Sequence, residues 1–366
     1  MEERLVAGLY IHIPFCKKRC SYCDFFSTTL LARQDEYLAA VAKEIEARKD
    51  EAAEPIRTVY IGGGTPSTLS IGGLTAINQL ITSYSIAEYT FELNPGDATK
   101  EYFQHLLANG VNRLSIGIQS FQDNLLRLIG RRHDAKQAIQ AVRMAQDAGF
   151  ENISIDLMYA LPTQTMEQWK ADIETALSLH IQHISCYGLM YEEGTTLTRQ
   201  RDAGVIEPID EDTENAMYDY ICERLKKAGF VHYEVSNFAL QGFEAQHNSS
   251  YWDGTPYIGI GAGAHSYIGN VRSWNPKNLD AYIRGIENGD LVRESETLTE
   301  EDLYNERIML GMRTNQGVPD SFVSRNRVVL ELLKANGLLR ETEDKRIVAT
   351  QEGLHVLNRI IEDLMI

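Results

Sequence analysis

The chain of 366 residues has no long hydrophobic run and a deficit of basic residues. No stretch approaches the roughly 18 apolar residues that a transmembrane helix requires, so the sequence predicts no membrane span. Lys and Arg together number 35, against 52 Asp and Glu, which gives a formal net charge of −17. Because nucleic acids and anionic lipids attract basic surfaces, this balance argues against binding to either.

The sequence also predicts no secretory signal. The sequence begins Met-Glu-Glu-Arg, without a basic segment, and the apolar stretch that follows ends at Cys16. We therefore expect a cytoplasmic protein. In such a reducing compartment, clustered cysteines are more often metal ligands or catalytic groups than disulfides.

The first half of the sequence alternates short apolar strands with amphipathic helices. Strands are expected at 7–13, 58–61, 89–93, 113–118, 153–158 and 183–189. Helices are expected at 34–49, 74–83, 100–109, 135–148 and 166–180. This alternation predicts an α/β fold with a parallel sheet, and six units fit an open six-stranded (β/α)6 partial barrel over residues 1–240.

The remainder of the chain follows different patterns. Residues 241–297 are expected to be a connecting segment rich in glycine and aromatic residues. From 298 to 366 the sequence predicts helices at 303–311 and 320–335, a hairpin at 338–350 and a last helix from 353. This order of elements suggests a small winged-helix-like α+β domain, but its acidic balance disfavours DNA binding.

Three of the five cysteines form the pattern Cys16-x3-Cys20-x2-Cys23. Thiolates are good ligands for iron–sulfur clusters and for zinc. Structural zinc needs four ligands, and His12 is the one conceivable fourth. A [4Fe-4S] cluster on three cysteines leaves one iron open for a ligand. The spacing favours the cluster and leaves zinc open, while Cys186 and Cys222 are expected to be buried structural residues.

Polar or small residues follow the ends of five expected strands. Cys16 follows the first strand, Gly62–Gly64 the second and Gln119 the fourth, while Glu92 and Asp156 lie near the ends of the third and fifth. In barrels of parallel strands, this carboxyl-terminal rim is where ligands bind.

The segment Tyr-Ile-His-Ile-Pro-Phe-Cys-Lys-Lys-Arg-Cys-Ser-Tyr-Cys-Asp-Phe, residues 10–25, resembles the radical-SAM signature of the oxygen-independent coproporphyrinogen oxidase superfamily. The similarity extends over essentially the whole chain and is greatest to the haem chaperones of the HemW type. It implies a [4Fe-4S] cluster on Cys16, Cys20 and Cys23, with S-adenosylmethionine bound beside it.

The resemblance also implies which residues hold S-adenosylmethionine. Gly63, Gly64 and Thr65, in Gly-Gly-Gly-Thr-Pro, correspond to the backbone that meets the amino group of the ligand. Glu92 corresponds to an acceptor for that ammonium or for a hydroxyl group. Arg131 corresponds to the arginine that pairs with the carboxylate, where a bidentate guanidinium fits well.

Four further positions match the same pattern. Gln119 and Asp156 correspond to polar residues that face the ribose hydroxyls. Tyr10 and Tyr22 correspond to aromatic residues beside the cluster and the adenine. Together these positions describe a complete ligand site on one rim of the expected barrel.

Two features distinguish branches of the superfamily. Cys23-Asp24-Phe25 lacks the further cysteine that true coproporphyrinogen oxidases carry two residues after the third, which argues against porphyrinogen decarboxylation. His247-Asn248-Ser249-Ser250-Tyr251-Trp252 matches a His-Asn-x-x-Tyr-Trp motif associated with haem binding. Imidazole is an axial ligand of haem iron and aromatic rings pack on porphyrins, so the motif fits haem. His265 is a second candidate ligand.

The resemblance therefore implies a haem chaperone that passes haem to respiratory haem proteins, expected to be membrane-bound. Whether it is also an enzyme that cleaves S-adenosylmethionine stays open. Two alternatives remain at this point: a radical-SAM enzyme acting on a porphyrin-type substrate, and an electron-transfer or interaction protein that merely holds a cluster.

Overall fold

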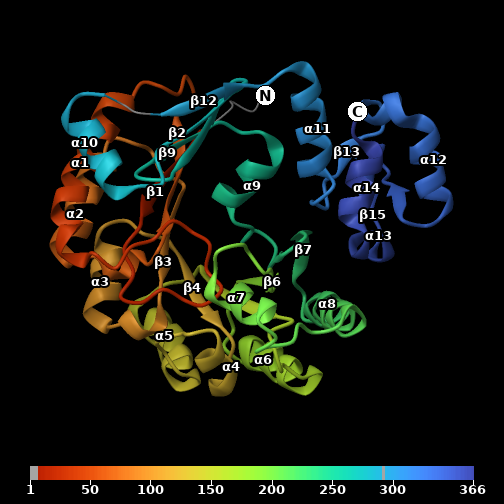
Figure 1. Ribbon diagram of the computed structural model, residues 1–366, viewed down its shortest axis with the longest axis horizontal. Coiled ribbons are helices and arrows are strands. Elements are labelled where there is room, and N and C mark those ends of the chain that lie inside the picture. The colour runs from red at the N-terminus through yellow and green to blue at the C-terminus, as the bar shows by residue number, and fades with distance from the viewer. Residues whose placement is uncertain (1–6, 291–292) are drawn as a thin grey trace.

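Six parallel strands form the centre of the structure, in the order of the sequence (Figure 1). The computed structural model describes residues 7–290 and 293–366, so the first residues, which bear on targeting, lie outside it. The strands are β1 (Ala7–Ile13), β2 (Ile56–Gly63), β3 (Glu88–Leu93), β4 (Arg113–Gln119), β5 (Ile153–Tyr159) and β6 (His183–Gly188). The six-stranded parallel core expected from the sequence is confirmed.

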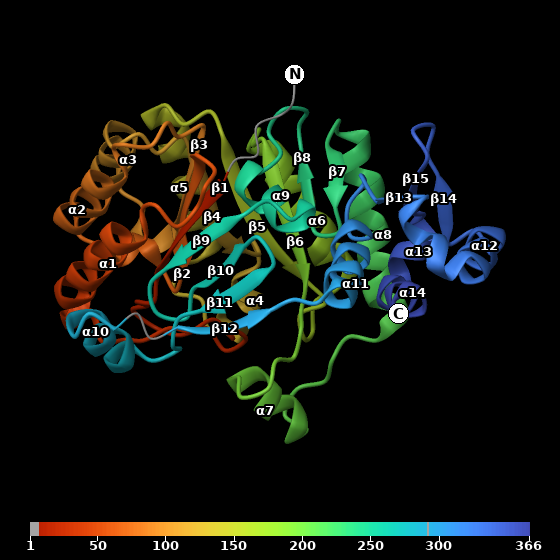
Figure 2. The ribbon, with the colours of Figure 1, turned by 90° about the horizontal axis from the view of Figure 1, so that it is seen from above.

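Over the fully described stretch 7–227, six α-helices connect these strands along the outside of the curved sheet, and two more follow β6, the first of which projects away from the sheet (Figures 1 and 2). They are α1 (Gln34–Arg48), α2 (Ile71–Ile81), α3 (Lys100–Ala108), α4 (Asp123–Leu128), α5 (Ala135–Ala148), α6 (Met166–Ser178), α7 (Thr196–Asp202) and α8 (Glu211–Lys227). Asp134 begins α5 and Thr165 begins α6 with capping boxes, which satisfy backbone N–H groups at the helix start.

The sheet continues beyond the six expected strands at both edges. Among the described residues it contains twelve strands, in the order β12-β11-β10-β9-β1-β2-β3-β4-β5-β6-β8-β7. The added strands are β7 (Val231–Glu234), β8 (Asn237–Ala239), β9 (Tyr257–Ile260), β10 (His265–Ile268), β11 (Val271–Trp274) and β12 (Glu294–Thr297). Residues 241–297 thus supply four strands of the sheet, with α9 (Gln246–Asp253) and α10 (Leu279–Glu287) between them.

The C-terminal residues pack around a second hydrophobic core, at the end of the molecule opposite α1 and α2 (Figure 1). The elements are α11 (Glu300–Gly311), β13 (Val318–Pro319), α12 (Arg327–Ala335), β14 (Leu339–Glu341), β15 (Arg346–Ala349), α13 (Gln351–His355) and α14 (Leu357–Leu364). The expected single helix at 320–335 is wrong: a 3-10 segment, Phe322–Asn326, precedes α12. The side-chain amide of Asn326, the residue before α12, donates to the carbonyl of Leu364 at 2.8 Å.

The two faces of β4 differ in polarity, and the polar face lines a cavity on the inner side of the curved sheet. Leu114, Ile116 and Ile118 are fully buried in the core beneath the helices. The alternating residues of the strand lie on the other face and line a cavity, namely Arg113, Ser115, Gly117 and Gln119. Since side chains alternate along a strand, the polar half of this pattern points inward and the apolar half packs outward.

A buried ion pair ties α1 to the added strands. Glu44 and Arg48 are 0% and 2% exposed, and their side chains meet at 3.0 Å. Glu44 also accepts from the Tyr282 hydroxyl at 2.7 Å and from the backbone N–H of Gly261 at 2.8 Å. Arg48 donates to the carbonyl of Gly259 at 2.7 Å. One pair therefore joins α1, β9 and α10.

We expect Glu44→Ala to lower the free energy of unfolding by about 3–5 kcal/mol, because it leaves the buried Arg48 with only the partly exposed Glu51 as counter-ion and leaves the donors of Tyr282 and Gly261 without an acceptor. Urea unfolding followed by circular dichroism measures the change. Glu46→Ala is the matched control, since Glu46 is exposed and pairs with Lys49 on the surface of the same helix. The control should change stability by less than about 1 kcal/mol. Equal effects of the two variants would contradict a structural role of the buried pair.

Candidate functional site

The interior of the sheet encloses a cavity of about 570 Å³. All three cysteines of the motif line it, as do eight of the nine positions assigned to S-adenosylmethionine: Tyr22, Gly63, Gly64, Thr65, Glu92, Gln119, Arg131 and Asp156. Tyr10 does not line the cavity; its hydroxyl meets Nδ1 of His12 at 2.9 Å. The structure thus brings together residues that are up to 140 positions apart in the sequence, Cys16 and Asp156 among them.

Two glycines after β2 let the chain pass close to the cysteine loop. The backbone N–H of Gly64 donates to the carbonyl of Ile13 at 2.9 Å. A Cβ atom on Gly64 would lie 2.8 Å from Pro14 and 3.0 Å from the Cys16 sulfur. Gly63 has a φ of +113°, and a Cβ there would lie 2.6 Å from the His12 ring. Only glycine fits both positions, which leaves backbone groups exposed to the cavity.

The cysteine loop is fastened to β1 by backbone hydrogen bonds. Cys16 N–H donates to the carbonyl of Thr28 at 2.9 Å, and Thr28 N–H donates to that of Pro14 at 2.7 Å. Burial raises the pKa of the Cys16 thiol, and it raises that of Cys23 to about 11. Because metals bind thiolates, metal binding here must release protons, and its affinity depends on pH.

The arrangement of donors disfavours a single zinc ion. Among residues 7–290 and 293–366, no three His, Cys, Asp or Glu side chains converge on one ion position. His12, the conceivable fourth ligand, has both ring nitrogens engaged: Nε2 donates to the carbonyl of Phe26 at 2.9 Å and Nδ1 accepts from Tyr10. Three thiols spread around one cavity fit a larger polynuclear cluster better.

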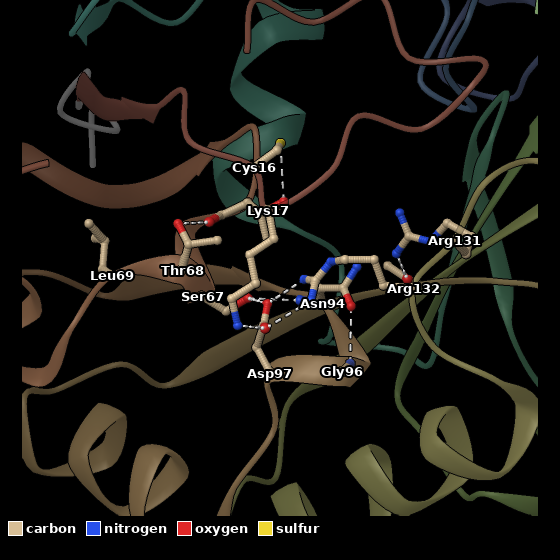
Figure 3. A network of polar contacts seen from close by, with 12 residues as sticks. Cys16, Lys17, Ser67, Thr68, Leu69, Asn94, Gly96, Asp97, Arg131 and Arg132 are labelled. Atoms are coloured by element: carbon tan, nitrogen blue, oxygen red, sulfur yellow. Dashed lines mark hydrogen bonds and ion pairs between the residues drawn. The ribbon is translucent and has the colours of Figure 1, made fainter. Parts of the chain in front are cut away.

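Asp97 fastens the cysteine loop to the loop that carries Arg131 (Figure 3). Its carboxylate pairs with Lys17 at 2.7 Å and with Arg132 at 2.7 Å. It also accepts from the Ser67 hydroxyl at 3.0 Å. Burial alone would raise the pKa of Asp97, but hydrogen bonds from Arg132 and Lys17 lower it below its usual value. Asp97 is not among the residues predicted from the sequence. Its position in the Asn-Pro-Gly-Asp turn directly after β3 is the sequence feature that could have identified it.

The adjacent arginines have different roles. Arg132 forms the ion pair with Asp97, whereas Arg131 lines the cavity. Arg131 donates to the carbonyl of Gly117 and, at 3.4 Å, to the sulfur of Cys20. Its Nε is buried and has no hydrogen-bond partner among the described residues. An incompletely satisfied guanidinium beside the cysteine loop is suited to a carboxylate ligand.

Two buried carboxyl groups face the cavity. Glu92 accepts from the Tyr60 hydroxyl at 2.8 Å and from the backbone N–H of Gly63 at 3.1 Å. Burial raises the pKa of Glu92 to about 7 and that of Asp156 to about 6. Asp156 accepts from Ser115 at 3.4 Å. Because these values lie near neutrality, a cation that enters the cavity can shift both groups to the ionised form.

Gln119 sits at an irregularity of β4. Its φ is +72°, in the left-handed region, and the pairing with β5 shifts register between Gly117 and Gln119. A bulge of this kind re-aims a side chain at the end of a strand. A left-handed conformation in a non-glycine residue is a mark of sites where geometry is imposed by function.

His247 of the expected haem motif is fully buried, and both of its ring nitrogens are engaged. Nδ1 lies 2.9 Å from the Thr58 hydroxyl and Nε2 lies 2.9 Å from the Tyr251 hydroxyl. The ring stacks on Tyr60 with 5.3 Å between centroids. Burial, and then the charge of Arg113, lowers the pKa of His247 to about 3. In this conformation the imidazole holds α9 on the sheet and has no nitrogen available for iron.

The other motif residues are divided between the cavity and the outside. Asn248 lines the cavity, whereas His247, Tyr251 and Trp252 do not. Tyr251 packs edge-on against Tyr257, at 4.7 Å between centroids. His265, the second candidate, is exposed on β10 and does not line the cavity either.

Comparisons with known proteins agree over nearly the whole chain. The Radical SAM superfamily model matches residues 10–176, and the HemN C-terminal domain model matches residues 298–356. The chain is 38% identical to the protein named heme chaperone HemW of Lactococcus lactis, covering 98% of this chain and 97% of that protein. It is 39% identical to the Bacillus subtilis protein of the same name, covering 84% of each.

A solved structure supports the fold. Coproporphyrinogen III oxidase (HemN) of Escherichia coli matches 99% of this chain and 90% of that one, with a TM-score of 0.84 at 23% identity. No helix of the described residues is long and apolar enough to cross a membrane. Because the chain is 38% and 39% identical to these two bacterial relatives over 98% and 84% of its length, and both domain models match it, the chain belongs to the HemW family of radical-SAM proteins.

Proposed function

We propose that this protein is a haem chaperone that binds haem and passes it to haem proteins of the respiratory chain. The observation that carries the proposal is one cavity lined by the three cysteines, by the S-adenosylmethionine positions and by Asn248 of the haem motif. Relatives that cover nearly the whole chain are named heme chaperones, which supports the same function.

In this proposal Cys16, Cys20 and Cys23 hold a [4Fe-4S] cluster, and S-adenosylmethionine lies beside it. The backbone at Gly63 and Gly64 and the carboxylate of Glu92 bind the amino group, while Arg131 binds the carboxylate. Bound together, the cluster and S-adenosylmethionine can supply one-electron chemistry at the sulfonium. Gln119, Asp156 and Tyr22 orient the ribose and adenine, whereas Tyr10, which lies outside the cavity, acts only through its contact with His12.

The mouth of the cavity suits a flat apolar ligand. Phe25 and Met190 line the cavity and are 67% and 70% exposed, and Tyr187 beside them is 39% exposed. Large exposed apolar side chains gathered at a cavity are a mark of ligand or partner binding. Lys18 and Arg19 also line it and provide positive charge for acidic groups. A porphyrin with carboxylate side chains has both complementary features.

Haem contact by the motif would then come first from Asn248, which already faces the cavity. His247 could bind iron only after exchanging its hydrogen bonds to Thr58 and Tyr251. The haem-receiving proteins are proposed to be membrane-bound, with this acidic chain meeting the membrane only through them.

Cys20→Ala should abolish the brown, air-sensitive absorbance of the anaerobically reconstituted protein, because a cluster with two thiolates loses an essential ligand. Iron and sulfide analysis measures the loss. Cys186→Ala is the control, since Cys186 is buried on β6 and does not line the cavity. A full complement of iron and sulfide in Cys20→Ala would exclude Cys20 from the cluster.

Binding of S-adenosylmethionine should release a proton from Glu92, because its pKa of about 7 leaves the group half protonated at neutral pH and an ammonium favours the carboxylate. The affinity should therefore rise with pH through that value. Calorimetry near pH 7 in buffers of different ionisation enthalpy counts the protons. Glu92→Gln should release about half a proton fewer than the wild type. Unchanged release would remove Glu92 from the ammonium site; Glu101→Gln, exposed on α3, is the control.

Haemin should bind the reconstituted protein saturably, with equimolar stoichiometry of haemin to chain. His247→Ala should raise the dissociation constant about tenfold or more, because α9 loses its anchor to the sheet. An anaerobic titration followed at the Soret band measures both. A weaker affinity with an unchanged Soret position indicates an effect through α9, whereas a shifted band indicates iron ligation by His247. Val328→Ser, on the exposed face of α12, is the control. No saturable binding by the wild type would overturn the chaperone proposal.

A further inference from the structure

Arg113 is a buried cation on the inner face of the sheet that neither the cluster nor the S-adenosylmethionine site uses. It begins β4, is 2% exposed, and lines the cavity. Gly117, which contacts Arg131, lies four residues further along the same strand. At about 3.3 Å per residue, the backbone of Arg113 lies roughly 13 Å from that of Gly117, toward the amino-terminal end of the strand.

The guanidinium of Arg113 is poorly satisfied. Its single hydrogen bond in the described part of the chain runs from Nη1 to the Thr90 hydroxyl, at a long 3.5 Å. Nε is buried without a partner, and no described carboxylate oxygen lies within 4 Å of the group. Thr90 donates in turn to the carboxylate of Glu88 at 3.4 Å, so the charge of Arg113 has an indirect partner, whereas its Nε has no acceptor. A buried donor left without an acceptor is costly, so a ligand that supplies one is favoured there.

The carboxyl groups nearby are engaged elsewhere. Glu88 accepts from the backbone N–H groups of Gln246 and His247, both at 2.9 Å, and so caps α9. Glu92 accepts from Tyr60. Asp156 accepts from Ser115. None of these acids compensates Arg113 by direct contact.

The histidines close to Arg113 do not offset its charge either. Burial and then the charge of Arg113 lower the pKa of both His183 and His247, so both rings stay neutral. His183 is fully bonded, to Ser154 at 2.7 Å and to the Tyr233 hydroxyl at 2.7 Å. The floor of the cavity therefore contains one buried donor group that lacks an acceptor.

Arg131 provides an internal comparison. Arg113 and Arg131 are the two arginines whose buried Nε lacks a partner among residues 7–290 and 293–366, and both line the same cavity. Arg131 is the proposed receptor for the carboxylate of S-adenosylmethionine. The same signature at the floor of the cavity predicts the same chemistry there, because a guanidinium fork matches a carboxylate in two parallel hydrogen bonds.

We infer that Arg113 binds a second carboxylate, at the floor of the cavity and apart from the Arg131 site. The carboxylate could belong to the propionate side chain of a tetrapyrrole, a case that rests on the proposed haem function, or to a free small carboxylic acid. Recognition is the same in both cases, and two probes distinguish the sources.

The first probe is metal-free protoporphyrin IX compared with its dimethyl ester, with binding to the full chain followed by fluorescence quenching. The wild type should bind the free acid at least about tenfold more tightly than the ester, as expected for a charge-assisted hydrogen bond. Arg113→Gln should bring the two affinities together. Arg143→Gln, exposed on α5, removes the same charge outside the cavity and should keep the preference.

The second probe is sodium propionate, measured by thermal unfolding of the ligand-free chain against sodium chloride at equal ionic strength. Propionate should raise the melting temperature of the wild type and of Arg143→Gln, and should raise that of Arg113→Gln by less, because only the Arg131 site then remains. A response to this probe without porphyrin binding supports the inference, identifies a small carboxylic acid as the source and counts against the haem function.

Two results would overturn the inference. One is porphyrin binding with equal affinity for acid and ester, together with no stabilisation by propionate; this leaves the haem function intact. The other is a carboxylate preference that persists in Arg113→Gln. Should Arg113→Gln fail to fold, Arg113→Lys keeps the charge but loses the planar guanidinium and should reduce the preference for the acid; an unchanged preference would overturn the inference.

Discussion

The parallel pairing of β1 with β2 is the constraint on which the site depends. It continues one residue past β2, where the N–H of Gly64 donates to the carbonyl of Ile13, and it leaves no room for a side chain at Gly63 or Gly64. Because of this close approach, the loop that follows β1 and the turn that follows β2 form one wall. The thiol of Cys16 then lies 3.3 Å from the Thr65 hydroxyl. A single larger residue at either glycine would separate the cysteine loop from the backbone groups beside it, and no change elsewhere could restore the contact.

The charged side chains in the cavity lack partners that a bound ligand can supply. Arg131 and Arg113 each keep a buried Nε without a partner, and Glu92 and Asp156 have pKa values near neutrality because burial disfavours their ionised forms. Each group is therefore held in a state that a ligand of opposite charge can improve. Asp97 differs, because Lys17 and Arg132 already neutralise it and so fix the loops. The contrast separates residues that bind from residues that position: the first have unmet partners in the cavity, and the second are fully paired at its edge.

The sequence predicted the six parallel strands because each combines a β-branched or apolar run with a following helical period. It also predicted that Cys16, Glu92 and Asp156 share one rim with the glycines after β2 and with Gln119, because carboxyl ends of parallel strands share one edge. The places of Tyr22, Thr65 and Arg131 in the site came only from the family resemblance. It could not predict β9–β12, because runs of four residues carry too little periodicity to count as strands. Nor did it single out Arg113, although the alternation Arg-Leu-Ser-Ile-Gly-Ile-Gln contains the signal. From the sequence alone, Arg113 is one more polar residue of an alternating strand. Only the three-dimensional structure shows that its side chain is buried and that its Nε has no acceptor.

The haem motif shows the limit of transferring a role with a sequence pattern. His-Asn-x-x-Tyr-Trp places His247 and Tyr251 one helical turn apart on α9, so their side chains meet and bond to each other. The same imidazole bonds to Thr58 on β2 and stacks on Tyr60, and the Tyr60 hydroxyl donates to Glu92. One chain of contacts therefore runs from α9 to the carboxyl group that faces the cavity. Any movement of α9 that releases His247 toward iron also removes the ring on which Tyr60 rests, and so alters the hydrogen bond that stabilises the ionised form of Glu92. Iron ligation by His247 and the protonation of Glu92 cannot be independent in this fold.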